Sequence, residues 1–334
     1  MTIPSTAPGA PDDRTAANRR DFLKATLAAS ATLAGAAAAS AETGSDALES
    51  SELLALDQMA TKPSTLAMSP RVTYLGGPTY LIEIGQFRIV TDPGFDPQGT
   101  ERSEGPGHVL TKVMAPPIPV DKLGPVDIVL LSHAQHLDNL DNEGRRLLAR
   151  VGTTITTPAS AAMSLPGKKV QGLATWASTA VTNAAGERLT ITATPAVHTS
   201  NPDLREAVGE VTGFMIEWQG SAGGAFYVSG DTVWIDEILE IAKRFRVEAG
   251  ILHLGAANVP AVGENYLTMS SAEGARAAKA LGLKRVYPAH FEGWRHFSQG
   301  SWSIAREFEK AGLTEALVLL RPGESRNVVA PVSA

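Results

Sequence analysis

The sequence predicts an α/β fold in which two sheets pack face to face and helices cover their outer sides. The chain has 334 residues, of which 43% are hydrophobic, so it can bury the core of one large or two modest domains. Two blocks of short β-like runs each lead into helical patterns, which is typical of sheets layered with helices. No short-period repeat is visible, which argues against a solenoid or a propeller.

The first block of strands begins at Arg71. Residues 71–95 alternate apolar and polar side chains and are interrupted at Gly76-Gly77-Pro78 and Gly85-Gln86, so they predict an antiparallel meander that ends at Asp92. The elements expected next are a buried strand over 126–132, a helix over 142–150 and a strand over 153–157.

The second block begins with predicted strands over 186–197, 210–218 and 224–231. Helices and strands then alternate. The expected elements are a helix over 232–245, a strand over 249–255, a helix opened by the capping box Ser270-x-x-Glu273, a strand over 285–290, a helix over 304–310 and a strand over 316–323.

The first 41 residues have the features of a targeting segment. Arg19 and Arg20 precede an Ala-rich apolar stretch, and Ala39-Ser40-Ala41 supplies a small-residue cleavage site, so residues 1–41 resemble a bacterial twin-arginine signal peptide. A membrane anchor is the alternative, but the apolar stretch of about 17 residues is short for a span. We therefore expect a periplasmic or secreted protein with no stable membrane insertion after cleavage. Residues 42–69 are interpreted as a polar lead-in segment and residues 70–334 as the functional domain.

Composition narrows the chemistry that this domain can perform. The chain has no cysteine, which excludes disulfides and thiolate metal sites. It carries a net charge of −6, and no Lys/Arg cluster follows the signal, so the electrostatic signature of a nucleic-acid-binding protein is missing. A small molecule is the partner that we expect, and the sequence does not indicate an oligomeric state.

Polar side chains of the metal-binding types follow several predicted strands. The richest stretch is SHAQHLDNLD at positions 132–141, directly after an apolar run. If the strands lie side by side, the loops that follow them share one edge, and residues distant in sequence meet there. Imidazoles and carboxylates without cysteine are the ligand set of Zn, Mn or Fe at a hydrolytic centre. The candidates are His133, His136, Asp138, His198, Asp231 and His290.

The order of these motifs resembles that of the metallo-β-lactamase superfamily. The four motifs are SHAQHLDNLD, TPAVHTS, YVSGDTVW and YPAHFEGW, and the likeness extends from about Arg71 to Gly323. Among the branches of this superfamily, the chain is most similar to the ascorbate-6-phosphate-lactonase-like group. The resemblance implies a four-layer αββα sandwich of two mixed sheets with helices outside, and a metallo-β-lactamase-like hydrolase domain over 70–334.

The resemblance also implies roles for individual residues. His133, His136 and His198 would form a first metal site, Asp138 and His290 a second, and Asp231 would bridge them. Zinc is the expected metal, as one or two ions, with manganese or iron as alternatives. Asp138 would also act in catalysis by orienting a metal-bound hydroxide or accepting its proton.

The loop at positions 133–139 departs from the family pattern His-x-His-x-Asp-His. It has one additional residue between His133 and His136, so it must bulge, and Asn139 stands where the last histidine is usual. A weak amide oxygen in place of an imidazole leaves the number of bound ions open.

Other residues near the motifs have weaker assignments. Taken singly, His198, Asp231 and Asp138 have ordinary structural interpretations, such as capping a helix, and we assign Asp141 to that role. Four further side chains are expected near the metals or in the pocket, namely Asp92, His253, Trp294 and His296. We expect Asp92 to form a hydrogen bond with a ligand histidine. His253 is more readily a core or supporting residue than a ligand, and Trp294 and His296 are expected to pack the pocket wall.

The predicted activity is metal-dependent hydrolysis of a small ester, lactone or amide. The sequence lacks a Gly-x-Ser-x-Gly elbow, which argues against a covalent serine hydrolase. A phosphodiesterase of the same fold is one alternative, and a non-catalytic exported protein that binds a metal or ligand is another. The substrate cannot be chosen from fold and metal site alone.

Overall fold

The computed structural model describes residues 69–105, 108–221 and 224–328. The predicted signal peptide over 1–41 and all but the last residue of the predicted lead-in over 42–69 lie outside these residues. Among the residues described, no helix is both long and apolar enough to cross a membrane.

The first sheet has seven strands and is mixed. Its order is β15-β1-β2-β3-β6-β7-β8, antiparallel from β15 to β3 and parallel from β3 to β8. The predicted meander is confirmed as its antiparallel part. The strands are β1 (Arg71–Gly76), β2 (Thr79–Ile84), β3 (Phe87–Thr91), β6 (Ile128–Leu130), β7 (Thr153–Thr156), β8 (Val170–Gly172) and β15 (Ser325–Asn327).

The second sheet has six strands and is also mixed. Its order is β14-β13-β12-β11-β10-β9, parallel from β14 to β12 and antiparallel from β12 to β9. The strands are β9 (Ser178–Thr182), β10 (Arg188–Thr194), β11 (Gly213–Trp218), β12 (Gly224–Val228), β13 (Arg246–His253) and β14 (Arg285–Ala289).

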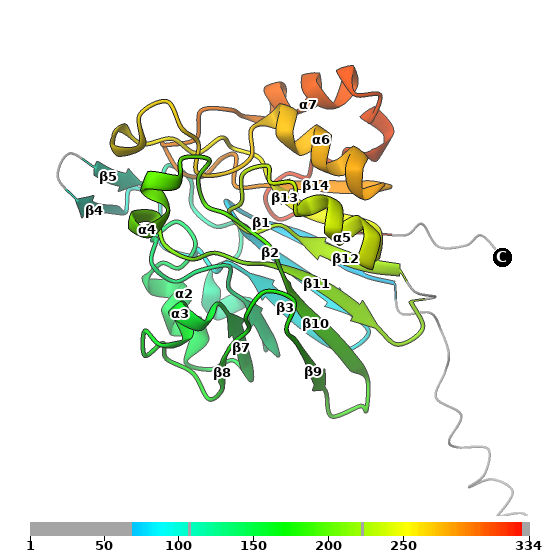
Figure 1. Cartoon of the computed structure of the whole chain (residues 1–334). Helices are drawn as coiled ribbons and strands as arrows, with labels where there is room; N and C mark the ends of the chain where they lie inside the picture. The colour runs from blue at the N-terminus through cyan, green and yellow to red at the C-terminus, as the bar shows by residue number, and fades with distance from the viewer. Residues whose placement is uncertain (1–68, 106–107, 222–223, 329–334) are drawn as a thin grey trace, which may run out of the picture. The chain divides into compact units, whose positions relative to one another are not determined.

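Helices cover the outer sides of both sheets, which completes the predicted αββα sandwich (Figure 1). The outer helices of the first sheet are α2 (Asn142–Leu148) and α3 (Pro158–Ala161), and those of the second are α5 (Ile238–Arg244), α6 (Ser271–Leu281) and α7 (Ser301–Lys310). A short helix α4 (Arg205–Val208) lies in the loop between β10 and β11. The predicted caps are confirmed: Asp141 accepts a bond from the amide of Gly144 in α2, and Ser270 and Glu273 form the capping box of α6.

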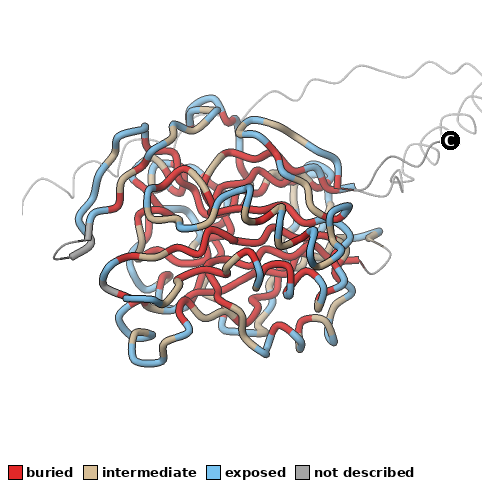
Figure 2. The backbone as a smooth tube through the Cα atoms, turned by 90° about the horizontal axis from the view of Figure 1, so that it is seen from above, coloured by how far each residue is buried: buried red, intermediate tan, exposed pale blue. Residues whose placement is uncertain are grey.

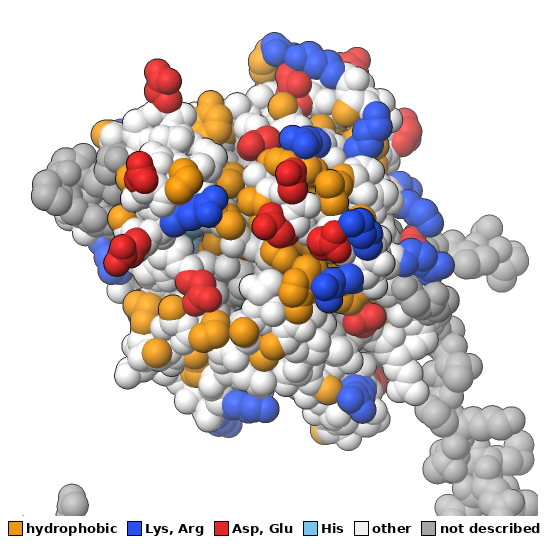
Figure 3. Space-filling model, viewed as in Figure 1, with side chains coloured by type: hydrophobic (Ala, Val, Ile, Leu, Met, Phe, Trp, Pro, Cys, Tyr) orange, Lys and Arg blue, Asp and Glu red, His pale blue; other side chains and the backbone are white. Residues whose placement is uncertain are grey.

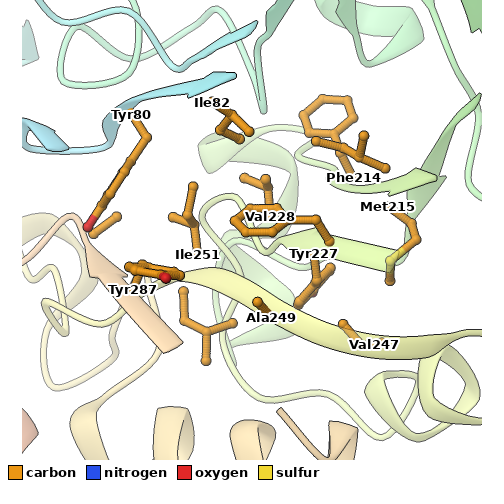
Figure 4. Packing of buried hydrophobic residues seen from close by; sticks show 14 of the residues in the cluster. Tyr80, Ile82, Phe214, Met215, Tyr227, Val228, Val247, Ala249, Ile251 and Tyr287 are labelled. Carbon is orange, nitrogen blue, oxygen red and sulfur yellow. The ribbon is translucent and has the colours of Figure 1, made fainter. Parts of the chain in front are cut away.

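The main core lies between the two sheets. Alternation along β2 places Tyr80 and Ile82 in this core and Leu81 in a separate cluster beneath α2. Phe214 and Ile251 approach from the second sheet, as Figure 4 shows. Seen from above in Figure 2, the buried segments run through the middle of the molecule and the exposed ones form its rim. The same apolar layer therefore holds both sheets, and with them the loops at the ends of their strands.

Three local predictions are wrong or incomplete. The helix expected over 232–245 begins only at Ile238, because the amide of Val233 donates to Val197 O (2.9 Å) and residues 231–237 follow the neighbouring loop instead. The run over 316–323 is not a strand and makes only one bridge, between Leu317 and Val286. A hairpin of β4 (Glu101–Gly105) and β5 (His108–Thr111) stands where no element was predicted from the sequence.

Candidate metal centre

The topology brings the predicted metal-binding residues to one edge of the sandwich. Asp231, His253 and His290 follow or end the parallel strands β12, β13 and β14, whose carboxyl ends share that edge. His133 and His136 follow β6, and His198 follows β10. All six predicted ligands meet there, in adjoining clusters.

The first cluster consists of three imidazoles. His133 Nε2 lies 3.0 Å from His136 Nδ1, and His136 Nδ1 lies 2.9 Å from His198 Nε2. Four ligands arranged tetrahedrally at Zn–N distances are about 3.3 Å apart, which is close to this spacing. The insertion between His133 and His136 is therefore compatible with both rings reaching one point.

Hydrogen bonds on the far sides of two of these rings fix their orientation. His198 Nδ1 lies 2.7 Å from the carbonyl oxygen of Leu267 and donates to it, so in the neutral ring Nε2 presents a lone pair to the cluster. His133 Nδ1 lies 2.9 Å from Ser132 Oγ. Burial, together with the neighbouring rings of His198 and His136, holds the pKa of His133 well below its ordinary value. The neutral imidazole that metals bind is thus the stable form.

The second cluster is built around one carboxylate oxygen. Asp138 Oδ2 lies 3.2 Å from His290 Nε2 and 3.0 Å from His296 Nε2. Burial raises the pKa of Asp138, but the close approach of His290 and His296 outweighs it and holds this pKa well below its ordinary value. Asp138 is therefore a carboxylate and has two imidazoles beside the same oxygen.

The third cluster surrounds Asp231. Its Oδ1 atom lies 2.6 Å from His253 Nδ1 and 2.8 Å from His290 Nδ1. Asp231 follows Gly230, whose φ is +59° and where an added Cβ would lie 2.8 Å from Ser132 Cβ. Glycine at this position lets the β12 loop approach the β6 loop closely enough to place Asp231 between the clusters.

His290 occupies a strained backbone position. It is fully buried with a φ of +55°, and its amide donates to Gly77 O (2.7 Å). Such strain in a non-glycine residue is common at functional sites. Burial lowers the pKa of His290, but the charge of Asp231 and the contact with Asp138 prevail and raise it to about 10.

The residues of these clusters fit a metal. Neither ring nitrogen of His290 makes an aligned hydrogen bond, although each lies within 3.2 Å of a carboxylate oxygen. Donor atoms that approach one another in this way, buried and without hydrogen-bond alignment, are expected of side chains arranged around a cation. The three groups that could hold an ion are His133–His136–His198, Asp138–His290–His296 and Asp231–His253–His290.

Asn139 is buried beside both carboxylates, and its amide is positioned to donate. With the amide nitrogen turned toward the carboxylates, it lies 3.2 Å from Asp138 Oδ1 and 3.1 Å from Asp231 Oδ2. This orientation is the one that satisfies both carboxylates. Asn139 thus joins the carboxylates of two clusters.

Asp92 does not bond a ligand histidine, contrary to the sequence prediction. Its Oδ2 atom lies 3.9 Å from His253 Nε2, beyond hydrogen-bond range, whereas Oδ1 accepts from the amide of Ser132 at 2.7 Å. Burial raises the pKa of Asp92, and the nearby charge of Asp231 adds to this rise. Asp92 therefore anchors the loop that starts the motif rather than the ring of a ligand.

The other two predicted pocket residues behave differently from each other. Trp294 is buried against Leu110 and Leu137 and does not line the pocket beside the clusters, and Lys112 Nζ lies over its ring, 5.3 Å from the centroid. His296 does line that pocket and also contacts Asp138, a contact that sequence reasoning missed. The available signal was a second histidine six residues after His290.

A pocket of about 500 Å³ opens onto the clusters. Its floor includes His136, Asp138, His198, Asp231 and His296. One wall is the apolar cluster of Val208, Ala257, Val259, Val262 and Leu267, continued by Leu204. The unpredicted hairpin contributes Arg102, Ser103 and Leu110 to the lining. The site can therefore hold a small molecule with an apolar group on one side and polar atoms facing the clusters.

Comparison with known proteins agrees with this architecture. The family model described as Beta-lactamase superfamily domain matches residues 87–291. A UPF0173 metal-dependent hydrolase of Methanopyrus kandleri is 25% identical over 264 residues, covering 76% of this chain and 98% of that protein. One from Pyrococcus furiosus is 26% identical over 261 residues, with coverages of 76% and 98%.

Solved structures share the fold at lower identity. An isothiocyanate hydrolase from Delia radicum gut bacteria superposes with a TM-score of 0.65 at 21% identity, covering 78% of this chain and all of that one. A possible metal-dependent hydrolase from Veillonella parvula gives a TM-score of 0.66 at 18% identity, with the same coverages.

The fold, the clusters of His and Asp side chains and the relatives agree with one another. Together they define a metal-dependent hydrolase of the metallo-β-lactamase fold. The chain belongs to the β-lactamase superfamily, whose model spans more than half of its length.

Proposed function

We propose that this chain is an exported hydrolase that opens a small ester, lactone or amide carrying an apolar substituent. The observation that carries the proposal is the pocket of about 500 Å³ that joins the three clusters to a continuous apolar wall. Its small-molecule dimensions and its wall of Val, Ala and Leu side chains suit an acyl, alkyl or aryl group beside a carbonyl.

The metal arrangement in this proposal uses the side chains already described. His133, His136 and His198 would hold the first ion, Asp138 and His290 would belong to the second position, and Asp231 would lie between the two. Zinc is the proposed metal, with manganese or iron as alternatives for a set of nitrogen and oxygen donors. A bound metal would polarise the scissile carbonyl and activate water for attack.

Asp138 is the proposed catalytic residue. It lines the pocket, and its low pKa keeps it ionised over the ordinary working range of pH. A strongly acidic carboxyl group is a weak base, so its contribution is to orient the attacking water by accepting a hydrogen bond. His253 supports the neighbouring carboxylate. Its Nδ1 atom lies 2.6 Å from Asp231 Oδ1 and helps to fix the position of Asp231.

The pocket favours a carbonyl substrate over a phosphodiester. Among the pocket residues that the structure describes, Arg102 is the only Lys or Arg. Phosphodiester recognition usually relies on several cationic or amide donors, whereas a lactone or amide needs few. In keeping with this, the face in Figure 3 shows acidic and basic side chains interspersed, without an extended basic patch.

Export is proposed from the sequence of the first 41 residues. The paired Arg19-Arg20, the Ala-rich stretch and the Ala39-Ser40-Ala41 site support it. Twin-arginine export carries folded proteins, which suits a protein that acquires its metal before it crosses the membrane.

A substrate panel tests the proposal. The purified protein is incubated with a lactone, a β-lactam, an aryl ester and a bis-aryl phosphodiester, each with and without chelator. Chelator-sensitive turnover of the lactone, ester or lactam is expected. Turnover of the phosphodiester alone would contradict the substrate class, and bound metal without turnover of any compound would favour a binding protein.

A further inference from the structure

We infer that His296 is a ligand of the second metal position, together with Asp138 and His290, and that Asn139 is a hydrogen-bond donor and not a ligand. The imidazole missing at position 139 would thus be supplied from a loop 157 residues further along the chain. This assignment rests on the proposed metal centre and deepens it.

The first support is the convergence of three donor atoms. Asp138 Oδ2 has His290 Nε2 at 3.2 Å on one side and His296 Nε2 at 3.0 Å on the other. The three atoms all lie within 4.8 Å of one another. This spacing resembles that of the first cluster, and two imidazoles with one carboxylate form a common set of three protein ligands for catalytic zinc.

The second support is the rigid placement of His296. Its carbonyl oxygen accepts from Asn258 N (3.0 Å), and the preceding residue Arg295 donates its amide to Thr111 O (3.1 Å). The ring packs against Phe297, with centroids 4.5 Å apart. Backbone bonds on both sides therefore hold the loop, as expected for a residue that must present one atom at a fixed point.

The third support is the state of the ring itself. The His296 side chain is 9% exposed, and its Nδ1 atom is buried without a hydrogen-bond partner. Because the ring is nearly buried, its Nε2 atom meets Asp138 Oδ2 largely shielded from solvent. Nε2 is directed at Asp138 Oδ2, the same oxygen that His290 Nε2 approaches.

Asn139 explains why another imidazole is needed. In the orientation that satisfies both carboxylates, its amide nitrogen donates to Asp138 Oδ1 (3.2 Å) and Asp231 Oδ2 (3.1 Å). It is fully buried and does not line the pocket. Asn139 thus holds Asp138 so that the other oxygen, Oδ2, faces His290 and His296.

Metal binding measured without any substrate tests the inference. The wild type, His296→Ala, His296→Gln and His198→Ala are stripped with chelator and reloaded with Zn²⁺ or Co²⁺. Ions per chain, competition with a chelating dye and the Co²⁺ absorption spectrum are then recorded. Arg295→Ala is the matched control, because Arg295 is the exposed neighbour of His296 in the same loop.

We expect two ions in the wild type and in Arg295→Ala. Both His296 variants should keep the first ion and bind the second at least about 100-fold more weakly, because loss of a ligand should exceed the 10- to 100-fold cost of losing an outer partner. His296→Gln preserves bulk, so it answers the question if His296→Ala does not fold.

Two unaltered ions in both His296 variants, or a single ion in the wild type, would overturn the role of His296. Full metal content in His198→Ala would instead overturn the metal centre on which that role depends. The two failures are therefore distinguishable.

Discussion

His136 Nδ1 lies 2.9 Å from His198 Nε2, and in the neutral form of His198 this Nε2 atom carries a lone pair, because the other nitrogen of the ring donates to Leu267 O. At this distance the lone pair of His198 must face either a proton or a cation. His133 Nε2 lies 3.0 Å from the same His136 atom, so a single proton cannot serve every pair of rings. A metal ion can, and the buried, neutral His133 is suited to it.

Gly230→Ala should destabilise the protein and misplace Asp231. The residue has a φ of +59°, and its Cβ would collide with the carbonyl oxygen of Thr212 and with Ser132 Cβ, so a loss of about 2–4 kcal/mol in the free energy of unfolding is expected. Gly186→Ala is the control, since Gly186 has a φ of +79° but open space around it. Denaturant titration should show the control losing only about 1 kcal/mol. Equal losses would disprove the close approach of Thr212 and Ser132 to Gly230.

The metal-free protein should lose stability on both sides of neutral pH. The pKa of His290 rises from 6.5 to about 10, so its stabilising contribution is complete below about pH 6.5 and is lost as pH rises through 10. The pKa values of Asp138 and Asp231 lie below 3.8, so their contribution is present above that pH and is lost as pH falls.

Denaturation midpoints in excess chelator, measured at about pH 3, 6, 8 and 10, check both sides of this window. His290→Asn is the matched variant and should flatten the decline on the alkaline side. An undiminished alkaline decline in that variant would assign the effect to other groups.

The apolar wall should make catalytic efficiency depend on substrate chain length. Each methylene buried against Val259 and Val262 contributes about 0.8 kcal/mol, so kcat/KM should rise about fourfold per added methylene until the pocket is full. Val262→Ser should reduce this dependence, whereas Leu239→Ser, on the exposed side of α5, should not. A flat profile across an acyl series in the wild type would show that the substrate lies elsewhere.

Replacement of both Arg19 and Arg20 by lysine should retain the protein in the cytoplasm. The paired arginines are the part of a twin-arginine signal that lysine does not replace well. Fractionation of cells that express the full chain, with Arg14→Lys as the control, measures this. Unchanged export of the double variant would rule out the twin-arginine route.

The sequence was sufficient for the fold because its strongest signals were periodic. Alternation over 71–95 gave the meander, and capping residues gave the starts of α2 and α6. The helix expected to begin at Thr232 begins only at Ile238. The hydrogen bond from Val233 N to Val197 O overrides the local helix propensity there. The β4–β5 hairpin was missed because its strands are short and carry charged and polar residues instead of an apolar alternation.

The candidate site, like the fold, could be predicted only in part. Six residues were predicted because each stands at the end of a strand in a recognisable order, and the structure brings them together at one edge: His133, His136, Asp138, His198, Asp231 and His290. His296 and Asn139 have roles set by distances across loops, which no spacing in the chain reveals. Asp92 was placed near the correct residues but with the wrong partner, since only coordinates distinguish the amide of Ser132 from a histidine ring.

Crystallographic anomalous scattering at the absorption edge of the bound metal tests the central claim most directly. One peak is expected among His133 Nε2, His136 Nδ1 and His198 Nε2, and a second beside Asp138 Oδ2, His290 Nε2 and His296 Nε2. A metal-loaded crystal with no peak at these atoms, or with its peak at another place on the surface, would contradict it.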